Sequence, residues 1–282
     1  MKIMVYEARP DERADLEKQA ALHGVELSVT DAVPTLENAS LAAGCIGVSI
    51  LGQGCIDAAL LDAYHALGIR YLSTRTIGYD HIDLDHARSI GLRVCSASYA
   101  PNGVADFTVM MILMCLRHYK QALWRGQVND FSLTGLQGRE MKDLTIGIIG
   151  TGRIGAQVVR NLSGFGCRIL AYDLRRNPAV EPQVTYVDFD TLLAQSDVIT
   201  LHMPLLDSNR HIINRESVAK MRDGVVIVNC SRGELADIEA LIEGIETGKI
   251  GALGMDTVEG DEGIIHADHR VDILPNRNWF YL

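Results

Sequence analysis

The chain has 282 residues, of which 48% are hydrophobic and 22% charged, and its formal net charge is −10. This length is enough for two domains, and the negative charge disfavours nucleic acid and anionic membranes as partners. No stretch approaches the roughly 18 consecutive apolar residues of a membrane-spanning helix, and the apolar start is too short for a signal peptide. We therefore expect a cytoplasmic protein that binds neither nucleic acid nor membranes.

Six cysteines are scattered along the chain, and none forms a C-x-x-C pair. Most of them lie within apolar runs, which favours reduced, buried thiols in a reducing compartment. Neither a disulfide nor a bound metal is expected from Cys45, Cys55, Cys95, Cys115, Cys167 and Cys230.

The first hundred residues alternate predicted strands with predicted helices. The strands are expected at Lys2–Tyr6, Glu26–Val29, Cys45–Ile50, Tyr71–Ser73 and Leu92–Cys95. The helices are expected at Glu12–His23, Ile56–Leu67 and Leu84–Ile90. Asp57 and Asp83 are candidate N-caps, and the residues that follow the helix ends are Gly24, Gly68 and Gly91. This alternation predicts a parallel open sheet in an α/β domain over residues 1–100.

The segment after the fourth predicted strand is a candidate binding loop. Backbone N–H groups around Ile77 and Gly78 could form a nest that binds a carboxylate. Alternatively, Asp80 or Asp83 caps the helix that follows. The two interpretations are compatible, and the sequence leaves both open.

A long helix is predicted from Pro101 to Tyr119, because apolar residues recur there at helical spacing. Pro101 suits the first turn of a helix. This helix is expected to carry the chain from the first domain into a second one, which spans residues 101–282. Residues 120–143 are polar and mixed and contain glycines, so we expect a surface excursion there.

The second domain is predicted to contain another parallel sheet. Its strands are expected at Leu144–Ile149, Arg168–Tyr172, Val198–His202, Val225–Asn229 and Ala252–Met255. The connecting helices are expected near residues 153–163, 189–195, 215–221 and 237–247. The fold class is therefore α/β, with two doubly wound parallel-sheet domains, the second a Rossmann domain.

The most informative motif is a glycine triplet between a predicted strand and a predicted helix, which is typical of a dinucleotide-binding βαβ unit. Gly150 permits a tight turn, and Gly152 lets a pyrophosphate approach the backbone. Gly155 lets the helix lie close to the strand, and the helix N-terminus offers unpaired N–H groups to the phosphates. The alternative is a glycine turn that serves packing alone.

Asp173 ends the strand that follows the glycine motif, where the dinucleotide-binding unit has its acidic residue. Its carboxylate can accept hydrogen bonds from a ribose 2′-OH and would repel a 2′-phosphate. The sequence therefore favours NAD over NADP as cofactor. Arg175 and Arg176 follow closely and weaken this preference.

Further polar residues follow the predicted strands of the second domain, at the sheet edge where ligands bind. Arg232 could hold a carboxylate through two parallel N–H···O bonds, although a surface arginine in a turn is the alternative. His202 could be catalytic, but a polar wall of the cofactor pocket is the favoured interpretation. Several acids after Met255 could form a solvated loop, or one of them could tune a proton donor.

These residues resemble the D-2-hydroxyacid dehydrogenases, particularly the D-lactate dehydrogenase branch, over essentially the whole chain. The resemblance rests on the glycine motif with Asp173 and on four further segments, namely Thr74–Asp83, Tyr99–Asp106, Asn229–Gly233 and Gly254–Asp256. It implies hydride transfer between NAD(H) and a small 2-keto or 2-hydroxy acid, with pyruvate and D-lactate expected, in a homodimer.

The resemblance also implies roles for individual residues. Arg232 occupies the position that binds the substrate carboxylate and carbonyl in that family. Ile77, Gly78 and Tyr99 occupy positions that line the substrate site. The pyrophosphate lies on Arg153 and Ile154. Met203, Pro204 and Asn209 match positions along the cofactor. Cys230, Ser231 and Asp256 match positions near its nicotinamide end.

Two departures from the family pattern stand out. Asp261 occupies the place of the family's catalytic glutamate, and Glu262 follows it. The family's catalytic histidine comes after a segment like Asn276–Leu282, where this sequence stops, so a C-terminal truncation is expected, and substitution by His266 or His269 is disfavoured. The alternative function is a non-catalytic dinucleotide-binding protein or an inactive fragment.

Overall fold

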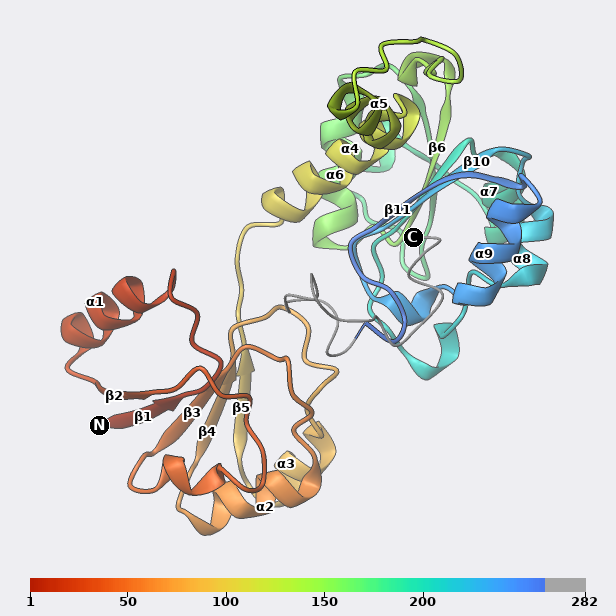
Figure 1. Cartoon of the computed structure of the whole chain (residues 1–282). Helices are drawn as coiled ribbons and strands as arrows, with labels where there is room; N and C mark the ends of the chain where they lie inside the picture. Colours follow the sequence, from red (N-terminus) through yellow and green to blue (C-terminus); the bar gives the residue numbers. More distant parts are fainter. Residues whose placement is uncertain (262–282) are drawn as a thin grey trace. The chain divides into compact units, whose positions relative to one another are not determined.

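The computed structural model describes residues 1–261. The chain divides into two compact units, one formed by Met1–Tyr99 and the other beginning at Ala100 (Figure 1). Each unit is built on one sheet whose neighbouring strands all run parallel. The predicted α/β class with two doubly wound parallel sheets is therefore confirmed.

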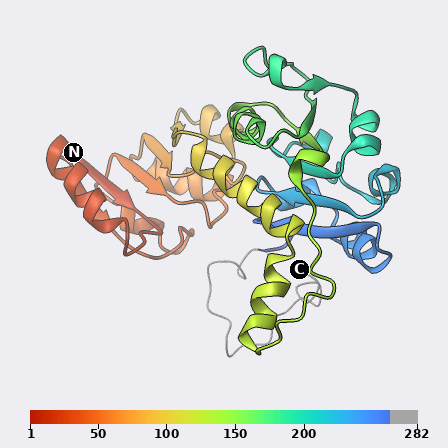
Figure 2. The same ribbon diagram turned by 90° about the horizontal axis from the view of Figure 1, so that it is seen from above.

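The first unit has a five-stranded sheet in the order β2-β1-β3-β4-β5. Its strands are β1 (Lys2–Val5), β2 (Glu26–Val29), β3 (Gly47–Ile50), β4 (Tyr71–Thr74) and β5 (Arg93–Ser96). Its helices are α1 (Arg13–His23), α2 (Ala58–Ala66) and α3 (Leu84–Ser89). Figures 1 and 2 show α1 over one face of this sheet and α2 and α3 over the other. The strand order reverses between β1 and β3, which makes this point the expected ligand crevice of the unit.

The local signals that were predicted to bound the helices of this unit are confirmed. Asp57 accepts a hydrogen bond from the Leu60 N–H at 2.9 Å, and Asp83 accepts one from the His86 N–H at 2.9 Å. The glycines that follow the helices have positive φ angles, namely Gly24, Gly68 and Gly91. Such caps satisfy N–H and C=O groups that the helix itself leaves unpaired.

The predicted helix over 101–119 is too long, and the predicted surface excursion is partly wrong. The helix α4 (Asn102–Leu116) ends where His118 adopts a positive φ of 49°. A further helix that was not predicted, α5 (Tyr119–Gln127), begins directly afterwards. None of the residues of α5 is buried, so no core-facing stripe marks it in the sequence.

The second unit has a six-stranded sheet in the order β11-β10-β9-β6-β7-β8. Its strands are β6 (Thr145–Ile149), β7 (Arg168–Tyr172), β8 (Thr185–Tyr186), β9 (Val198–Leu201), β10 (Val225–Asn229) and β11 (Ile250–Met255). Its remaining helices are α6 (Arg153–Ser163), α7 (Phe189–Gln195), α8 (Arg215–Lys220) and α9 (Ile238–Glu246). Strand β8 was not predicted, since two residues at a sheet edge leave no periodic pattern.

Short 3₁₀ helices complete the described part of the chain: η1 (Ala39–Ala42), η2 (Met141–Asp143), η3 (Glu181–Gln183), η4 (Asp207–Asn209) and η5 (Gly233–Leu235). Among residues 1–261, no helix combines the length and the apolar character needed to cross a membrane.

Both faces of the second sheet are covered by helices, and strand β10 shows how the sequence achieves this. Val226 and Val228 belong to the buried cluster formed with α4 and α6. Val225 and Ile227 belong to the cluster formed with α7, α8 and α9. A strand buried on both faces reads as a continuous apolar run, which explains why this element is recognisable from the sequence.

The prediction that most cysteines are buried is wrong. All six are free thiols, and only Cys45 is fully buried. Cys55 is exposed after β3, and Cys95 is exposed on β5, which is the last strand in the order of the first sheet. Apolar sequence neighbours did not distinguish these positions from core positions, because Cys55 lies in a loop and Cys95 on a strand at the sheet edge, where side chains are left uncovered.

Candidate active site

In the second unit, the predicted site residues lie at the carboxyl ends of the strands. The strand order reverses between β6 and β9, and ligands bind at such a reversal. The glycine loop follows β6 and Asp173 follows β7, while His202, Cys230 and Asp256 follow β9, β10 and β11 directly. The fold therefore gathers these residues at one edge of the sheet, as the sequence predicts.

The three motif glycines differ in what a side chain would meet. At Gly150, which has a φ of 93°, an added Cβ would lie 2.7 Å from the carbonyl oxygen of His202. At Gly155 a Cβ would lie 1.9 Å from the carbonyl oxygen of Gly150. At Gly152 a Cβ would meet no atom of residues 1–261 within 4 Å. Gly150 and Gly155 are thus required by packing, whereas Gly152 faces open space, as the approach of a phosphate group requires.

Helix α6 begins at Arg153, with Gly152 as its N-cap residue. A glycine has no side chain to bind the first N–H groups of the helix, and α6 has no side-chain cap. These donors and the positive end of an eleven-residue helix dipole suit a phosphate group. The backbone between Gly150 and Gly155 therefore fits the pyrophosphate of a dinucleotide.

Asp173 is engaged with the glycine loop. Its Oδ2 accepts hydrogen bonds from the Thr151 N–H at 2.6 Å and from the Thr151 hydroxyl at 3.0 Å. Its Oδ1 accepts one from the Arg175 N–H at 2.9 Å. Each carboxylate oxygen has further lone-pair capacity, so this arrangement positions Asp173 and still leaves acceptor sites for a ribose.

Two residues that the sequence analysis missed support the same loop. The Tyr186 hydroxyl donates to the Thr151 hydroxyl at 2.8 Å and accepts from the Asn177 N–H at 2.9 Å. The Asn177 side chain donates to the Thr151 carbonyl at 2.8 Å. The Arg176 guanidinium lies 5.5 Å from the centre of the Tyr186 ring, so it is drawn onto this aromatic face. No local motif marks Asn177 or Tyr186, because they reach the loop only through the fold.

His202 is buried at the end of β9, and its Nε2 lies 3.0 Å from the Thr200 hydroxyl. Burial lowers the pKa of His202 to about 3. The imidazole is therefore neutral near neutral pH and has no proton to give as an imidazolium. This favours the interpretation of His202 as a polar wall over that of a general acid.

The loop after His202 is closed by the side chain of Asn209. The Asn209 amide donates to the Pro204 carbonyl at 2.8 Å and lies 3.3 Å from the Met203 sulfur. Its carbonyl oxygen accepts from the Leu206 N–H at 2.8 Å. The structure thus brings together the three predicted cofactor-side residues Met203, Pro204 and Asn209.

A buried amide holds the turn that carries Arg232. The Asn229 side chain donates to the Arg232 carbonyl at 2.7 Å and accepts from the Ser231 N–H at 3.0 Å. The Ser231 hydroxyl donates to the Leu201 carbonyl at 2.7 Å. Burial raises the pKa of the neighbouring Cys230 thiol to about 11, so this cysteine stays protonated at neutral pH. Asn229 belongs to the motif recognised in the sequence, but its positioning role emerges only from the structure.

The loop after β11 lies against the turn of Arg232. The Asp256 N–H donates to the Asn229 carbonyl at 3.0 Å. A Cβ at Gly233 would lie 2.2 Å from the carbonyl carbon of Val258, so the two backbones touch. Asp261 turns back on this loop, since its Oδ2 accepts from the Val258 N–H at 3.1 Å.

The acidic loop is more than a solvated segment. Glu259 forms an ion pair with Arg210 at 2.7 Å, and its Oε2 lies 2.8 Å from Nε2 of His211. Glu262, which follows Asp261 in the sequence, and the disfavoured substitutes His266 and His269 lie outside the described residues.

In the first unit, the predicted nest follows β4. The Thr76 hydroxyl donates to the Gly78 carbonyl at 2.7 Å and lies 2.6 Å from the Thr74 hydroxyl, which fixes the turn. Within residues 1–261, the N–H groups of Ile77 and Gly78 donate no hydrogen bond, so both are available to a ligand. Tyr99 is 48% exposed. Asp83 caps α3 at the same time, so the two interpretations of this segment are compatible.

Comparison with protein families gives a match over residues 109–277 to the family described as D-isomer specific 2-hydroxyacid dehydrogenase, NAD binding domain. An aromatic 2-oxoacid reductase from Clostridium sporogenes is 41% identical over 278 residues, which cover 97% of this chain and 83% of that protein.

Solved structures show the same similarity. The apo structure of D-lactate dehydrogenase from Escherichia coli is 39% identical, with a TM-score of 0.84 over 92% of this chain and 83% of that chain. The NAD-complexed D-isomer specific 2-hydroxyacid dehydrogenase from Lactobacillus delbrueckii ssp. bulgaricus is 30% identical, with a TM-score of 0.82 over 100% of this chain and 86% of that chain.

Proposed function

The chain belongs to the D-isomer specific 2-hydroxyacid dehydrogenases, and we propose that it interconverts a small 2-oxo acid and the D-2-hydroxy acid with NAD(H). The observation that carries this proposal is the gathering of a dinucleotide-binding glycine loop, Asp173 and the Arg232 turn at one sheet edge. Residues 1–100 form the substrate domain and residues 101–282 the NAD-binding domain in this proposal.

The residues of the second unit fit NAD. The backbone from Gly150 to Gly155 with Arg153 and Ile154 would hold the pyrophosphate, and Asp173 the adenosine ribose. Further contacts along the cofactor would come from Met203, Pro204, Asn209, Cys230, Ser231 and Asp256. When bound, the nicotinamide supplies or accepts the hydride at C2 of the substrate.

The substrate carboxylate is the group that the chain's own residues are suited to bind. The Arg232 Nη1 donates to the Ser231 carbonyl at 2.9 Å. A planar guanidinium can pair with a carboxylate through two parallel N–H···O bonds, a geometry that Lys cannot reproduce. The available N–H groups of Ile77 and Gly78 offer a second type of donor, and Tyr99 offers an aromatic wall.

Asp261 is proposed as the carboxylate that keeps a proton donor charged. Only its Oδ2 is engaged by Val258 among the described residues. Its Oδ1 can therefore accept from a protonated imidazole, whose pKa a nearby carboxylate raises.

Pyruvate and D-lactate are the substrate pair we propose. The name D-lactate dehydrogenase of relatives from Escherichia coli and Lactobacillus delbrueckii supports this pair. The name of the Clostridium sporogenes relative, aromatic 2-oxoacid reductase, makes aromatic 2-oxo acids the alternative to test.

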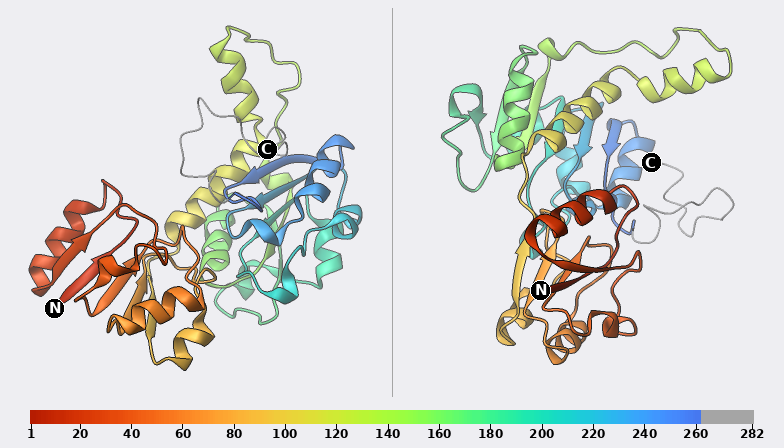
Figure 3. Two further views of the ribbon diagram at one scale, coloured as in Figure 1. Left: turned by 60° about the horizontal axis from the view of Figure 1, so that its bottom comes forward. Right: turned by 90° about the vertical axis from the view of Figure 1, so that its left-hand side faces the viewer.

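We also propose a homodimer and a cytoplasmic location. Large apolar side chains are exposed on α5 and in the connection to β6, among them Trp124 at 65%, Phe131 at 77% and Leu133 at 83%. Figure 3 shows α5 and this connection standing away from the sheet of their unit. Exposed apolar surface of this kind suits a second copy of the chain. The six free thiols support a reducing compartment.

The test is oxidation of NADH driven by pyruvate and by phenylpyruvate, together with NADH binding measured by fluorescence. Arg232→Gln should lower kcat/KM for the 2-oxo acid roughly 100-fold, since a charge-assisted bidentate contact is lost. Arg232→Lys should retain only part of the wild-type kcat/KM. Arg160 is exposed on α6, so Arg160→Gln should behave as wild type. NADH binding without turnover of any small 2-oxo acid would contradict the proposal and favour a non-catalytic dinucleotide-binding protein.

A further inference from the structure

Glu7 combines two features that rarely occur together in an acidic residue. It lies two residues after the end of β1 with a φ of 54°, a left-handed backbone conformation that non-glycine residues seldom adopt. It is also buried, with 3% of its surface exposed. A buried charge in a strained conformation persists only when its surroundings bind it firmly.

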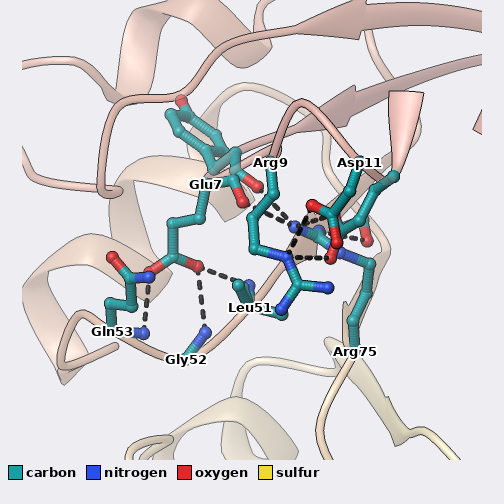
Figure 4. Close-up of polar contacts among 10 residues, drawn as sticks. Glu7, Arg9, Asp11, Leu51, Gly52, Gln53 and Arg75 are labelled. Atoms are coloured by element: carbon teal, nitrogen blue, oxygen red, sulfur yellow. Dashed lines mark hydrogen bonds and ion pairs between the residues drawn. The ribbon is translucent and has the colours of Figure 1, made fainter. Parts of the chain in front are cut away.

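The Glu7 carboxylate is bound by a nest of three consecutive backbone N–H groups (Figure 4). Its Oε2 accepts from the N–H groups of Leu51 and Gly52, the latter at 2.9 Å. Its Oε1 accepts from the Gln53 N–H at 2.7 Å. Successive N–H groups that converge in this way form an anion-binding concavity. Here the anion is a side chain of the protein itself.

The backbone of Glu7 is held from the other side by Arg75 (Figure 4). The Arg75 guanidinium donates to the carbonyl oxygens of Tyr6 and Glu7, each at 3.0 Å. It also donates to the Ser49 hydroxyl at 3.1 Å and forms an ion pair with Glu12 at 3.3 Å. Arg75 therefore joins the ends of β1 and β3 and the N-terminus of α1, and fixes the direction in which the Glu7 side chain leaves β1.

The bound loop, Leu51–Gln53, lies at the ligand edge of the first sheet. β1 and β3 are the two strands between which the strand order reverses, so Glu7 and the Leu51–Gln53 loop flank the expected crevice. The loop also touches the segment that follows β4. A Cβ at Gly52 would lie 3.0 Å from Cε1 of His81, and that segment includes the nest at Ile77 and Gly78.

We propose that Glu7 is a positioning residue, whose carboxylate holds the Leu51–Gln53 loop as a fixed wall of the substrate-binding edge. This inference rests on the proposed function only in taking a 2-oxo acid as the ligand. A carboxylate suits three N–H donors because both its oxygens accept. An amide at this position would present an NH₂ group to at least one donor, and an aspartate would be one methylene too short.

The experiment compares Glu7→Gly and Glu7→Gln with wild type. Glycine tolerates the φ of 54°, so Glu7→Gly removes the carboxylate without adding backbone strain. Glu26→Gln is the matched control, because Glu26 is an exposed acid of the same sheet. Two quantities are measured: amide hydrogen exchange of residues 51–53, and the Kd for oxamate, a non-reacting 2-oxo acid analogue, in the presence of NADH.

We expect exchange at residues 51–53 to be at least tenfold faster in both Glu7 variants, and sodium acetate to restore protection in Glu7→Gly. We expect the Kd for oxamate to rise about tenfold, because displaced binding groups lose much of their effect, with the Kd for NADH unchanged. Glu26→Gln should match wild type in each measurement.

Three results would overturn the inference: wild-type exchange at residues 51–53 in Glu7→Gly, faster exchange with an unchanged Kd for oxamate, or no binding of oxamate to wild type. If wild type binds oxamate but turns over no 2-oxo acid, the proposed function fails while a raised Kd in the Glu7 variants still supports this role.

Discussion

Polar side chains at the strand ends bind backbone groups of neighbouring loops and thereby fix where those loops lie. Asn229 holds the turn of Arg232, and Asp173 holds the glycine loop through Thr151. Glu7 does the same for a loop whose residues lie 44 to 46 positions further along the chain. Asp173 was predictable because a local motif contains it. Glu7 was not, because only the packing of β1 beside β3 brings its partners within reach.

Asp173 should determine the choice between the two nicotinamide cofactors. Asp173→Asn keeps the size of the side chain and an oxygen that can accept from Thr151, but it removes the charge that repels a 2′-phosphate. We expect the Kd for NADPH to fall about tenfold relative to that for NADH, which corresponds to roughly 1.4 kcal/mol. Fluorescence titration measures both constants. Asp190→Asn, an exposed position on α7, is the control, and an unchanged preference in Asp173→Asn would refute the charge argument.

His202 should make the protein less stable in mild acid. Its pKa is lowered to about 3 by burial, against 6.5 as its ordinary value. Between these values the unfolded chain binds a proton that the folded chain does not, so the free energy of unfolding falls as pH falls through this window. The loss is about 1.4 kcal/mol per pH unit below 6.5, or roughly 2 kcal/mol at pH 5.

Urea unfolding at pH 7 and pH 5 tests this, with His202→Gln as the variant. The variant should lose roughly 2 kcal/mol less than wild type between the two pH values. His23→Gln removes an exposed histidine in α1 and should keep the wild-type dependence. Equal slopes in wild type and His202→Gln would mean that His202 is protonated as easily in the folded protein as in the unfolded chain.

Among whole elements, β10 and α6 could be predicted from buried apolar patterns, whereas α5 and β8 could not. β10 was recognisable because both of its faces are buried, and α6 because Val158, Val159 and Leu162 form one buried stripe. α5 has no buried residue, and β8 has two residues at a sheet edge, so neither leaves a periodic pattern. The break between α4 and α5 occurs at a histidine with positive φ, which no sequence rule for glycine or proline marks.

The Asp197 carboxylate contacts several segments at the edge of the second sheet where its strands begin. Asp197 is buried and accepts from the Thr145 N–H at 2.9 Å, at the start of β6. It also forms ion pairs with Arg139 at 2.7 Å and with Arg222 at 3.1 Å, although both arginines are about half exposed. Its removal leaves a backbone donor without its partner, and that loss outweighs the partly screened ion pairs.

Asp197→Ala should therefore destabilise the protein by roughly 2–3 kcal/mol. The melting temperature should fall by roughly 5 °C or more in calorimetry. Asp223→Ala, which removes an exposed acid paired with Lys249, should leave the melting temperature unchanged. Similar melting temperatures for both variants would show that burial of Asp197 adds nothing to its contribution.

At the scale of the whole molecule, each unit has its own buried core and its own ligand edge. The sequence therefore could predict both sheets and the class of cofactor, because each depends on patterns within one unit. The second unit also has apolar surface that is not covered. This surface consists of a groove of about 640 Å³ lined by Val109, Met110, Leu113 and Phe165, and of the exposed side chains of α5 and of the connection from α5 to β6.

That surface leads to the prediction on assembly. Phe131 and Leu133 are the most exposed large apolar side chains of the segment after α5, and burial of such groups drives association. Wild type should sediment with twice the 30.9 kDa mass of the chain, whereas a variant with both Phe131→Asp and Leu133→Asp should sediment as a monomer, since a buried aspartate without a partner is strongly unfavourable. Leu22→Asp, at an equally exposed apolar position on α1, should stay dimeric. A monomeric wild type, or a double variant that remains dimeric, would show that this surface is not where two copies meet.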